Sequence, residues 1–192
     1  FVGVTDNENP VIVGTPGSFS QSNDPGLCTA VVNWTDPTAT DNCPGQTVSC
    51  SPVSGSTFAL GTTAVTCTAT DAAGNTSTST FDVTVADGEN PVLSGTPISF
   101  SQSTDPGLCT AVVNWTDPTA TDNCPGTPTV TCTPASGSIY DVGRTSVTCP
   151  ATDATNNIST STFVVTVIDD ENPVLAIPPV TLPQNTNPVI FT

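Results

Sequence analysis

The stretch that decides the fold lies at residues 24–45, which read DPGLCTAVVNWTDPTATDNCPG. The same 22 residues recur without a change at 105–126, an offset of 81. After one inserted residue, a looser match continues between residues 47–75 and 129–157. Self-similarity at a fixed period of this length is the signature of a tandem repeat protein, so two copies of one module are expected.

A linker with the pattern D-x-E-N-P-V precedes each module and marks its boundary. It starts at Asp6, at Asp87 and again at Asp169. The two outer segments align with the last strand and the opening of a module, so we interpret the chain as a window on a longer array; completion of neighbouring subunits by strand exchange is the alternative. The predicted parts are 1–5 (last strand of a preceding module), 6–86 (module one), 87–168 (module two) and 169–192 (linker and opening strand of a third).

Short alternating apolar runs between turn residues predict β-strands throughout each module. In 28–35 the side chains of Cys28, Ala30, Val32 and Trp34 share one face, because strand side chains alternate. Six or seven short strands in such a module favour an immunoglobulin-like β-sandwich, which gives an all-β, disulfide-bonded, elongated tandem array. The expected strands are 10–14 with 17–21, 28–35, 47–51, 57–60, 63–70 and 80–85.

Composition excludes several classes of function. The chain carries 17 Asp+Glu against a single Lys+Arg, which is Arg144, and it has no His, so its formal charge is −16. One cation cannot form a nucleic-acid surface, and no apolar run is long enough to span a membrane. Without His or Lys, most general-base chemistry has no residues to use. We therefore predict a protein that is not an enzyme, does not bind nucleic acid and does not insert in a membrane.

The motifs resemble those of the HYR (hyalin repeat) domain. The matching features are D-x-E-N-P, then A-V-V-N-W-T-x-P-x-A-x-D-N-C, then V-T-C-x-A-T-D-x-x-G-N and a final F-x-V-T-V. The resemblance covers essentially the whole chain. It implies an extracellular, immunoglobulin-like module of large, repetitive, non-catalytic surface or adhesive proteins.

The chain departs from the family pattern at a few positions. Many HYR modules carry a Cys pair where module one has Thr15 and Ser79, and module two has Thr96 and Ser161. The members are absent together, as a bonded pair would be. Asn156 replaces the glycine of the D-x-x-G-N turn in module two, and Asn tolerates the left-handed conformation that such a turn needs.

Each module contains four cysteines, which predicts disulfides and an oxidising compartment rather than a zinc site. They are Cys28, Cys43, Cys50 and Cys67, with Cys109, Cys124, Cys132 and Cys149 in the second copy. Our preferred pairing is Cys28–Cys43 with Cys50–Cys67. An immunoglobulin-like Cys28–Cys67 bridge with a local Cys43–Cys50 bridge is the alternative.

The carboxylates of the linkers predict calcium at the module junctions. In an immunoglobulin-like topology the linker and two loops share one end of the module, and clustered carboxylates without cations favour a hard divalent ion. The alternative is that these residues are ordinary turn-formers in solvated linkers. The candidate ligands are Asp6, Glu8, Asp41, Asp71, Asp87, Glu89, Asp122, Asp153, Asp169 and Glu171.

Four N-x-S/T sequons predict N-glycosylation, at Asn33, Asn75, Asn114 and Asn157. The function most consistent with these features is a structural repeat of an extracellular fibril, stalk or surface array, stiffened by calcium and decorated with glycans. Its partners would be copies of itself or adjoining modules of the same chain. The alternative is an adhesive module that binds another protein or a glycan at the cell surface.

Overall fold

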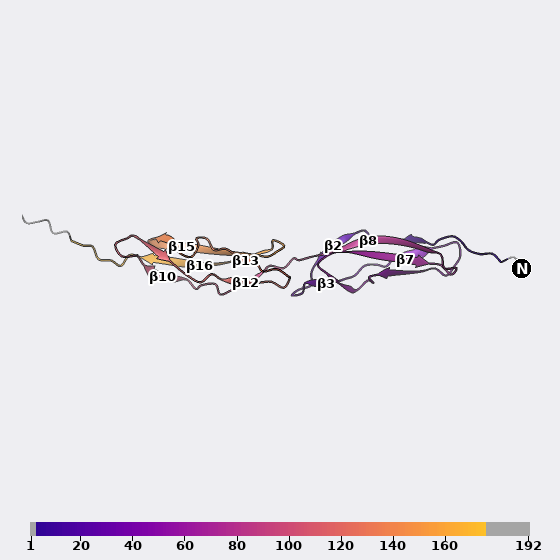
Figure 1. Ribbon diagram of the computed structural model, residues 1–192, viewed down its shortest axis with the longest axis horizontal. Coiled ribbons are helices and arrows are strands. Elements are labelled where there is room, and N and C mark those ends of the chain that lie inside the picture. Colours follow the sequence, from indigo (N-terminus) through magenta and orange to yellow (C-terminus); the bar gives the residue numbers. More distant parts are fainter. Residues whose placement is uncertain (1–2, 176–192) are drawn as a thin grey trace, which may run out of the picture.

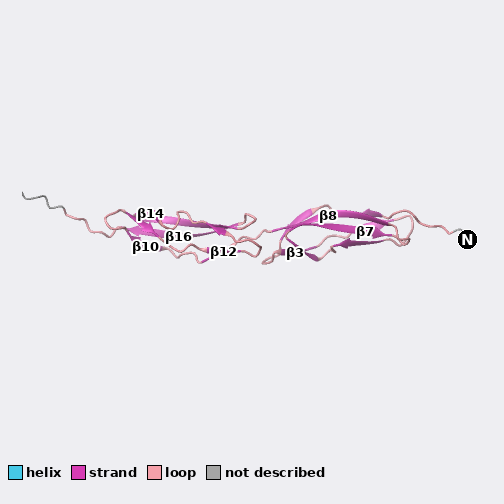
Figure 2. Ribbon diagram, in the orientation of Figure 1, coloured by secondary structure: helices cyan, strands magenta, loops and turns pink. Residues whose placement is uncertain are grey.

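Every regular element of the described chain is a β-strand. The computed structural model describes residues 3–175, and within them no helix occurs (Figure 2). Two β-sandwiches lie end to end along the long axis, with the N-terminus at one extreme of the rod (Figure 1). The predicted all-β tandem array is therefore confirmed. Residues 3–5 and 169–175 are not in strands, and the rest of the two outer strands expected over 1–5 and 169–192 lies outside the described residues.

The first domain contains eight strands in two layers. The larger layer is a sheet of order β2-β8-β7-β5, in which β2 and β8 run parallel, and the antiparallel pairs β1–β4 and β3–β6 face it. Strand Thr47–Ser51 has the bounds predicted for it, whereas β4 was not predicted. The strands are β1 (Val11–Val13), β2 (Phe19–Ser22), β3 (Thr29–Val32), β4 (Thr38–Thr40), β5 (Thr47–Ser51), β6 (Ser56–Ala59), β7 (Gly61–Thr70) and β8 (Thr76–Ala86).

The second domain repeats this order with one local change. Strand β13 is shorter than its counterpart β5, because Pro150 replaces the Thr68 of the first domain in the neighbouring strand. Proline has no backbone N–H to donate, so the ladder is interrupted beside it. The strands are β9 (Val92–Ser94), β10 (Phe100–Ser103), β11 (Thr110–Val113), β12 (Thr119–Thr121), β13 (Thr129–Val130), β14 (Ser138–Asp141), β15 (Gly143–Thr152) and β16 (Ile158–Ile168).

The core of each domain is a small cluster between the layers. Ala30 and Val32 are fully buried while Val31 is 47% exposed, so the predicted alternation of faces is confirmed. Trp34 is half-buried and packs edge-on against Phe58 and Phe81, with ring centroids 6.0 and 5.4 Å apart. Edge-to-face aromatic pairs add stability beyond the area they bury. Trp115 occupies the same place in the second domain.

Two departures from the family pattern have a direct structural outcome. Thr15 Oγ1 donates a hydrogen bond of 2.8 Å to Ser79 Oγ, so the positions that carry a Cys pair in many HYR modules do lie in contact. Asn156 adopts a φ of 70°, where the first domain has Gly74 at 94°. The prediction that asparagine preserves this left-handed turn is confirmed.

Candidate functional site

A disulfide between Cys28 and Cys124 joins the two domains. Their Cα atoms lie 4.9 Å apart, although 96 residues separate them in the chain. The predicted Cys28–Cys43 bridge is therefore wrong, and so is the alternative Cys28–Cys67 bridge. Strands β3 and β4 explain the error: they carry the chain from the junction, where Cys28 precedes β3, to the opposite end of the domain, where Cys43 follows β4.

Inside each domain a second disulfide links neighbouring strands, as predicted. Cys50 and Cys67 face each other directly in the register of β5 and β7, and Cys132 bonds to Cys149 in the second domain. Cys67 and Cys149 are fully buried, so these bridges belong to the cores. Two cysteines predicted to be bonded, Cys43 and Cys109, are exposed and unpaired within the described chain.

Asn23 fastens the linker to the first domain. Its side chain is 7% exposed, and its backbone N–H donates to Ala86 O at 2.9 Å. Its Oδ1 accepts from the Gly88 amide at 3.0 Å, while its Nδ2 donates to Leu27 O at 2.7 Å. Position 88 has no room for a side chain, since a Cβ on Gly88 would lie 2.8 Å from Ser22 Oγ. Sequence reasoning missed Asn23, although it directly precedes the repeated stretch.

Glu89 crosses back from the linker to the first domain. Both of its carboxylate oxygens accept from the Gly26 amide, at 2.9 and 3.0 Å. Glu171 makes the same contact with Gly107 one module later, at 2.9 and 3.1 Å. A carboxylate that accepts from a backbone N–H forms one of the stronger hydrogen bonds in proteins. The glutamate of each linker thus fixes the turn of the preceding domain, a role that the sequence did not suggest.

Three predicted ligands come together where the chain enters the first domain. We name Asp6, Asp41 and Asp71 the entry cluster, because one carboxylate oxygen of each lies within 4.8 Å of the others. Asp71 is 7% exposed, and Asp6 Oδ2 is a buried oxygen without a hydrogen-bond donor. The single basic side chain of the protein, Arg144, belongs to strand β15 of the second domain, so it is not part of this group of like charges.

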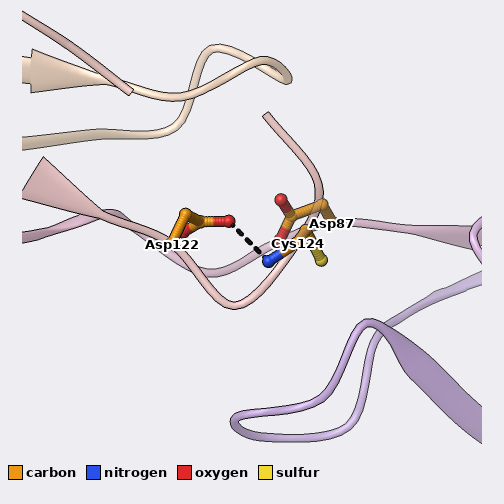
Figure 3. A group of neighbouring side chains, drawn as sticks. All are labelled: Asp87, Asp122 and Cys124. Carbon is orange, nitrogen blue, oxygen red and sulfur yellow. Dashed lines mark hydrogen bonds between the residues drawn. The ribbon is translucent and has the colours of Figure 1, made fainter. Parts of the chain in front are cut away.

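The equivalent group at the junction contains Asp87, Asp122 and Cys124, which we name the junction cluster. Figure 3 shows the three side chains converging, with the Cys124 amide donating to Asp122 Oδ2 at 2.9 Å. Asp122 Oδ1 is buried and has no donor. Asp153 lies outside this group. The Thr155 hydroxyl lies between Asp153 and Asp87, 3.0 Å from Asp153 Oδ1 and 3.3 Å from Asp87 Oδ2.

Hydrogen bonds set the ionisation of the two loop aspartates. Desolvation raises the pKa of Asp71, but hydrogen bonds from the Asn75 side chain and from the backbone amides of Asn75, Gly74 and Ala73 together outweigh it. The pKa of Asp71 therefore lies below its ordinary value of 3.8. The pKa of Asp153 is lowered for the same reason, by Asn157 and Thr155 against desolvation. Both carboxylates are ionised at neutral pH.

The thiol of Cys43 has the opposite shift. Its pKa is raised above the ordinary value, first by a hydrogen bond to Asp6, then by desolvation and by the negative charges of Asp6, Asp41 and Asp71. The entry cluster therefore favours the protonated form of this thiol.

The other predicted ligands are not brought into a group of three within the described residues. Asp6 Oδ1 accepts from the Glu8 amide, and Asp169 Oδ1 accepts from the Glu171 amide, each at 3.1 Å. Each contact closes a local turn within its linker, and aspartate is common in turns of this kind.

The four sequons divide into two kinds. Asn33 and Asn114 are exposed beyond the ends of β3 and β11. Asn75 Nδ2 instead donates both to Asp71 Oδ2 at 2.7 Å and to Asp6 O at 3.2 Å. Asn157 Nδ2 likewise donates to Asp153 and to the Asp87 carbonyl. A glycan on either of these nitrogens would replace one donated hydrogen.

The chain has two tandem immunoglobulin-like domains with disulfides, and residues of both domains meet at the junction. These features define the class of extracellular repeat proteins. The chain belongs to the HYR domain family, which matches residues 5–85 and 86–167. It is 31% identical to "Hyalin" of Strongylocentrotus purpuratus over 187 residues, covering 94% of this chain and 16% of that protein. It is 37% identical to "Hyalin" of Lytechinus variegatus over 158 residues, covering 80% of this chain and 30% of that protein.

The chain thus spans less than a third of the length of these relatives. Among solved structures, human protocadherin-24 EC1-2 (Form II) is similar with a TM-score of 0.40 and 19% identity, over 85% of this chain and all of that one. The family places the chain outside the cell or at its surface, as an adhesion or structural repeat. No helix in the described residues is long and apolar enough to cross a membrane.

Proposed function

We propose that the chain is a structural segment of an extracellular fibril, stalk or surface array, in which HYR domains are held end to end in one fixed orientation. The observation that carries this proposal is the Cys28–Cys124 bond, because a covalent link beside the linker gives two connections between the same pair of domains. Two connections restrict bending and twisting far more than a single flexible linker does.

The contacts around the bond support the same role. Asn123 Nδ2 of the second domain donates to Leu27 O of the first at 3.0 Å, and Glu89 and Asn23 fix the linker to the same turn. The junction is therefore made of directional hydrogen bonds and one covalent bond. An array built this way suits a passive scaffold, and we infer that it is not an enzyme, since the chain has no His or Lys to act as a base.

Calcium at the two acidic clusters is the second part of the proposal. Asp6, Asp41 and Asp71 would supply oxygen ligands at the entry cluster, and Asp87 with Asp122 would do so at the junction cluster. The support is the close approach of the carboxylates and the buried, unpartnered oxygens of Asp6 and Asp122. Calcium accepts six to eight oxygen ligands in flexible geometry, so water and backbone carbonyls could complete each shell. We leave Glu89 and Glu171 out of the ligand set, because both oxygens of each already accept from a backbone amide.

Glycans would attach at Asn33 and Asn114 under this proposal. Both side chains are exposed, and they are equivalent positions of the two domains. Sugars there would lie along the sides of the rod and would leave its ends free to join. Modification at Asn75 or Asn157 would disturb the hydrogen bonds that hold the entry and junction loops.

Two measurements test the proposal. Electron microscopy of native material should show filaments or stalks with a repeat equal to one domain, and compact monodisperse particles would contradict the array. Small-angle scattering of the purified chain, with calcium and then with a chelator, should show the same maximum dimension with a narrower distribution of shapes when calcium is bound. Identical scattering and identical melting in the two conditions would remove calcium from the proposal and leave the array standing.

A further inference from the structure

The two unpaired cysteines are the same two positions that form the junction disulfide. Cys109 occupies the place of Cys28, and Cys43 occupies the place of Cys124, within a stretch of 22 residues that is identical in the two domains. Each domain therefore carries two cysteines of this kind. One lies near the end that meets the following linker, and the other lies near the end where its own linker enters. The junction disulfide uses Cys28 and Cys124, which leaves Cys43 and Cys109 exposed at opposite ends of the two domains.

The surroundings of Cys109 match those of the bonded Cys28. In the first domain the Leu27 amide donates to Asp24 O at 2.9 Å, and in the second the Leu108 amide donates to Asp105 O at the same distance. Glu171 of the following linker already rests on this turn, as Glu89 rests on the turn at Cys28. The turn that holds Cys28 for bonding is thus fully formed at Cys109.

The surroundings of Cys43 match those of the bonded Cys124. The Cys43 amide donates to Asp41 Oδ2 at 3.1 Å, and the Cys124 amide donates to Asp122 Oδ2 at 2.9 Å. The linker aspartate lies beside the cysteine in both domains, as Asp6 beside Cys43 and as Asp87 beside Cys124. The loop that presents Cys124 is therefore also formed at Cys43.

We propose that Cys43 and Cys109 each supply one sulfur of a junction disulfide, and that this disulfide repeats at every junction of the array. Cys109 bonds to the Cys124 equivalent of an HYR domain that follows, and Cys43 bonds to the Cys28 equivalent of one that precedes. The inference rests on the proposed array. Each bond forms when two thiols lose two protons and two electrons to a small-molecule disulfide such as oxidised glutathione, which is released as two thiols.

The linker after the second domain lacks the contacts that Asn23 makes with the linker after the first. Thr104 replaces Asn23, and its Oγ1 is buried without a partner, so the side-chain contacts that Asn23 makes with Leu27 and Gly88 have no counterpart. The linker is held there by the Thr104 amide, which donates to Ile168 O at 3.0 Å, and by Ser103 Oγ, which donates to Asp170 at 2.8 Å.

The test uses the full chain and an extended chain in which residues 87–168 are repeated directly after residue 168. The full chain has eight cysteines and should show two free thiols, whereas the extended chain has four more cysteines and should still show two. Peptide mapping without reduction, after oxidation in a glutathione buffer, should recover Cys109 linked to the Cys124 of the added copy. Four free thiols, or none with Cys109 bonded inside its own domain, would overturn the inference.

Two substitutions in the extended chain act as matched controls. Cys109→Ser in the first copy should raise the number of free thiols to three, because it leaves the Cys124 of the added copy without a partner. Cys43→Ser should lower it to one, because that thiol was free. An unchanged count in Cys109→Ser would contradict the inference. The count does not depend on whether filaments form, so native filaments with unpaired Cys109 equivalents would overturn the repeating bond and leave the proposed function intact.

Discussion

The entry cluster and the junction cluster start from the same D-N-C tripeptide and the same linker aspartate, yet they gather different groups. Three carboxylates meet at the entry cluster, while two carboxylates and a cysteine meet at the junction cluster. One loop difference bears directly on this: the first domain has Ala73 where the second has Thr155. The Thr155 hydroxyl lies between Asp153 and Asp87, so a protein hydrogen bond takes the place that a third ligand would have.

This comparison shows how a repeated sequence can produce unequal sites. A single hydroxyl can donate one hydrogen bond, worth about 0.5–1.5 kcal/mol, to a carboxylate oxygen that the proposed ion would otherwise bind. The entry cluster should consequently bind calcium more tightly than the junction cluster, where the disulfide already holds the two domains together.

The largest expected effect comes from breaking the bond that distinguishes the two clusters. Cys28→Ser should lower the unfolding free energy by about 2–4 kcal/mol, because a disulfide that closes so long a loop strongly restricts the unfolded chain. It should also broaden the distribution of shapes in solution, because only the linker and hydrogen bonds then join the domains. Thermal melting and small-angle scattering measure both effects. Cys43→Ser is the control and should match the unmodified chain; a rigid Cys28→Ser rod would show that the bond is not what fixes the junction.

Exchanging the loop residues should exchange the calcium affinities. Ala73→Thr should weaken binding at the entry cluster, and Thr155→Ala should strengthen it at the junction cluster, each by roughly tenfold if the hydroxyl contributes about 1.4 kcal/mol. Isothermal titration with calcium would measure the two sites. Equal and opposite changes support the comparison, whereas unaffected titrations in both variants would mean that the hydroxyl does not compete with the ion.

The two linker glutamates should differ in importance. Glu89→Gln weakens the hydrogen bond to Gly26 at a junction that Asn23 and the disulfide also hold, and we expect a loss of about 1 kcal/mol after discounting for partial exposure. Glu171→Gln should leave the core of the second domain intact and change melting by less, since its linker leads to no further domain within the described residues. Melting temperatures of the two variants, compared side by side, test the order.

Acid should weaken both loops, and this is the smallest effect. The pKa values of Asp71 and Asp153 are lowered on folding, so each contributes stability that is present above the ordinary value of 3.8 and is lost as the pH falls through the lowered value. Melting temperature should therefore fall as the pH drops below 3.8. Asp71→Asn and Asp153→Asn should each flatten part of that dependence, and a decline of unchanged steepness in both would assign the acid sensitivity to other carboxylates.

Local pattern was sufficient for much of the fold. The alternation around Val31 and Val32, the Cys50–Cys67 bridge across neighbouring strands and the turn at Asn156 all depend on residues close in sequence or directly paired. Strand β4 was missed because its three residues follow Pro37 and resemble a loop.

The junction could not be predicted in the same way. Cys28 and Cys43 are near in sequence but lie at opposite ends of one domain, and only the path of β3 and β4 reveals this. The chemistry of Glu89 was also hidden, because a carboxylate in an acidic linker looks like a metal ligand until the Gly26 amide is seen beside it. The topology brings Asp6, Asp41 and Asp71 together at a shared end of the domain, as expected, but leaves Glu8 outside the group. That these residues bind a metal stays a prediction.

The Cys28–Cys124 bond also determines how the chain responds to tension. A fully extended chain spans at most about 3.3–3.6 Å per residue, so the sequence separation of 96 between the two cysteines corresponds to roughly 320 Å of contour length. Pulling on the two ends passes force through the sulfur atoms and bypasses this segment entirely. Even if both sandwiches unfolded, that length would stay hidden until the bond was reduced. Only the residues before Cys28 and after Cys124 could extend while the bond is intact, so the full reach of the two domains is released only by reduction.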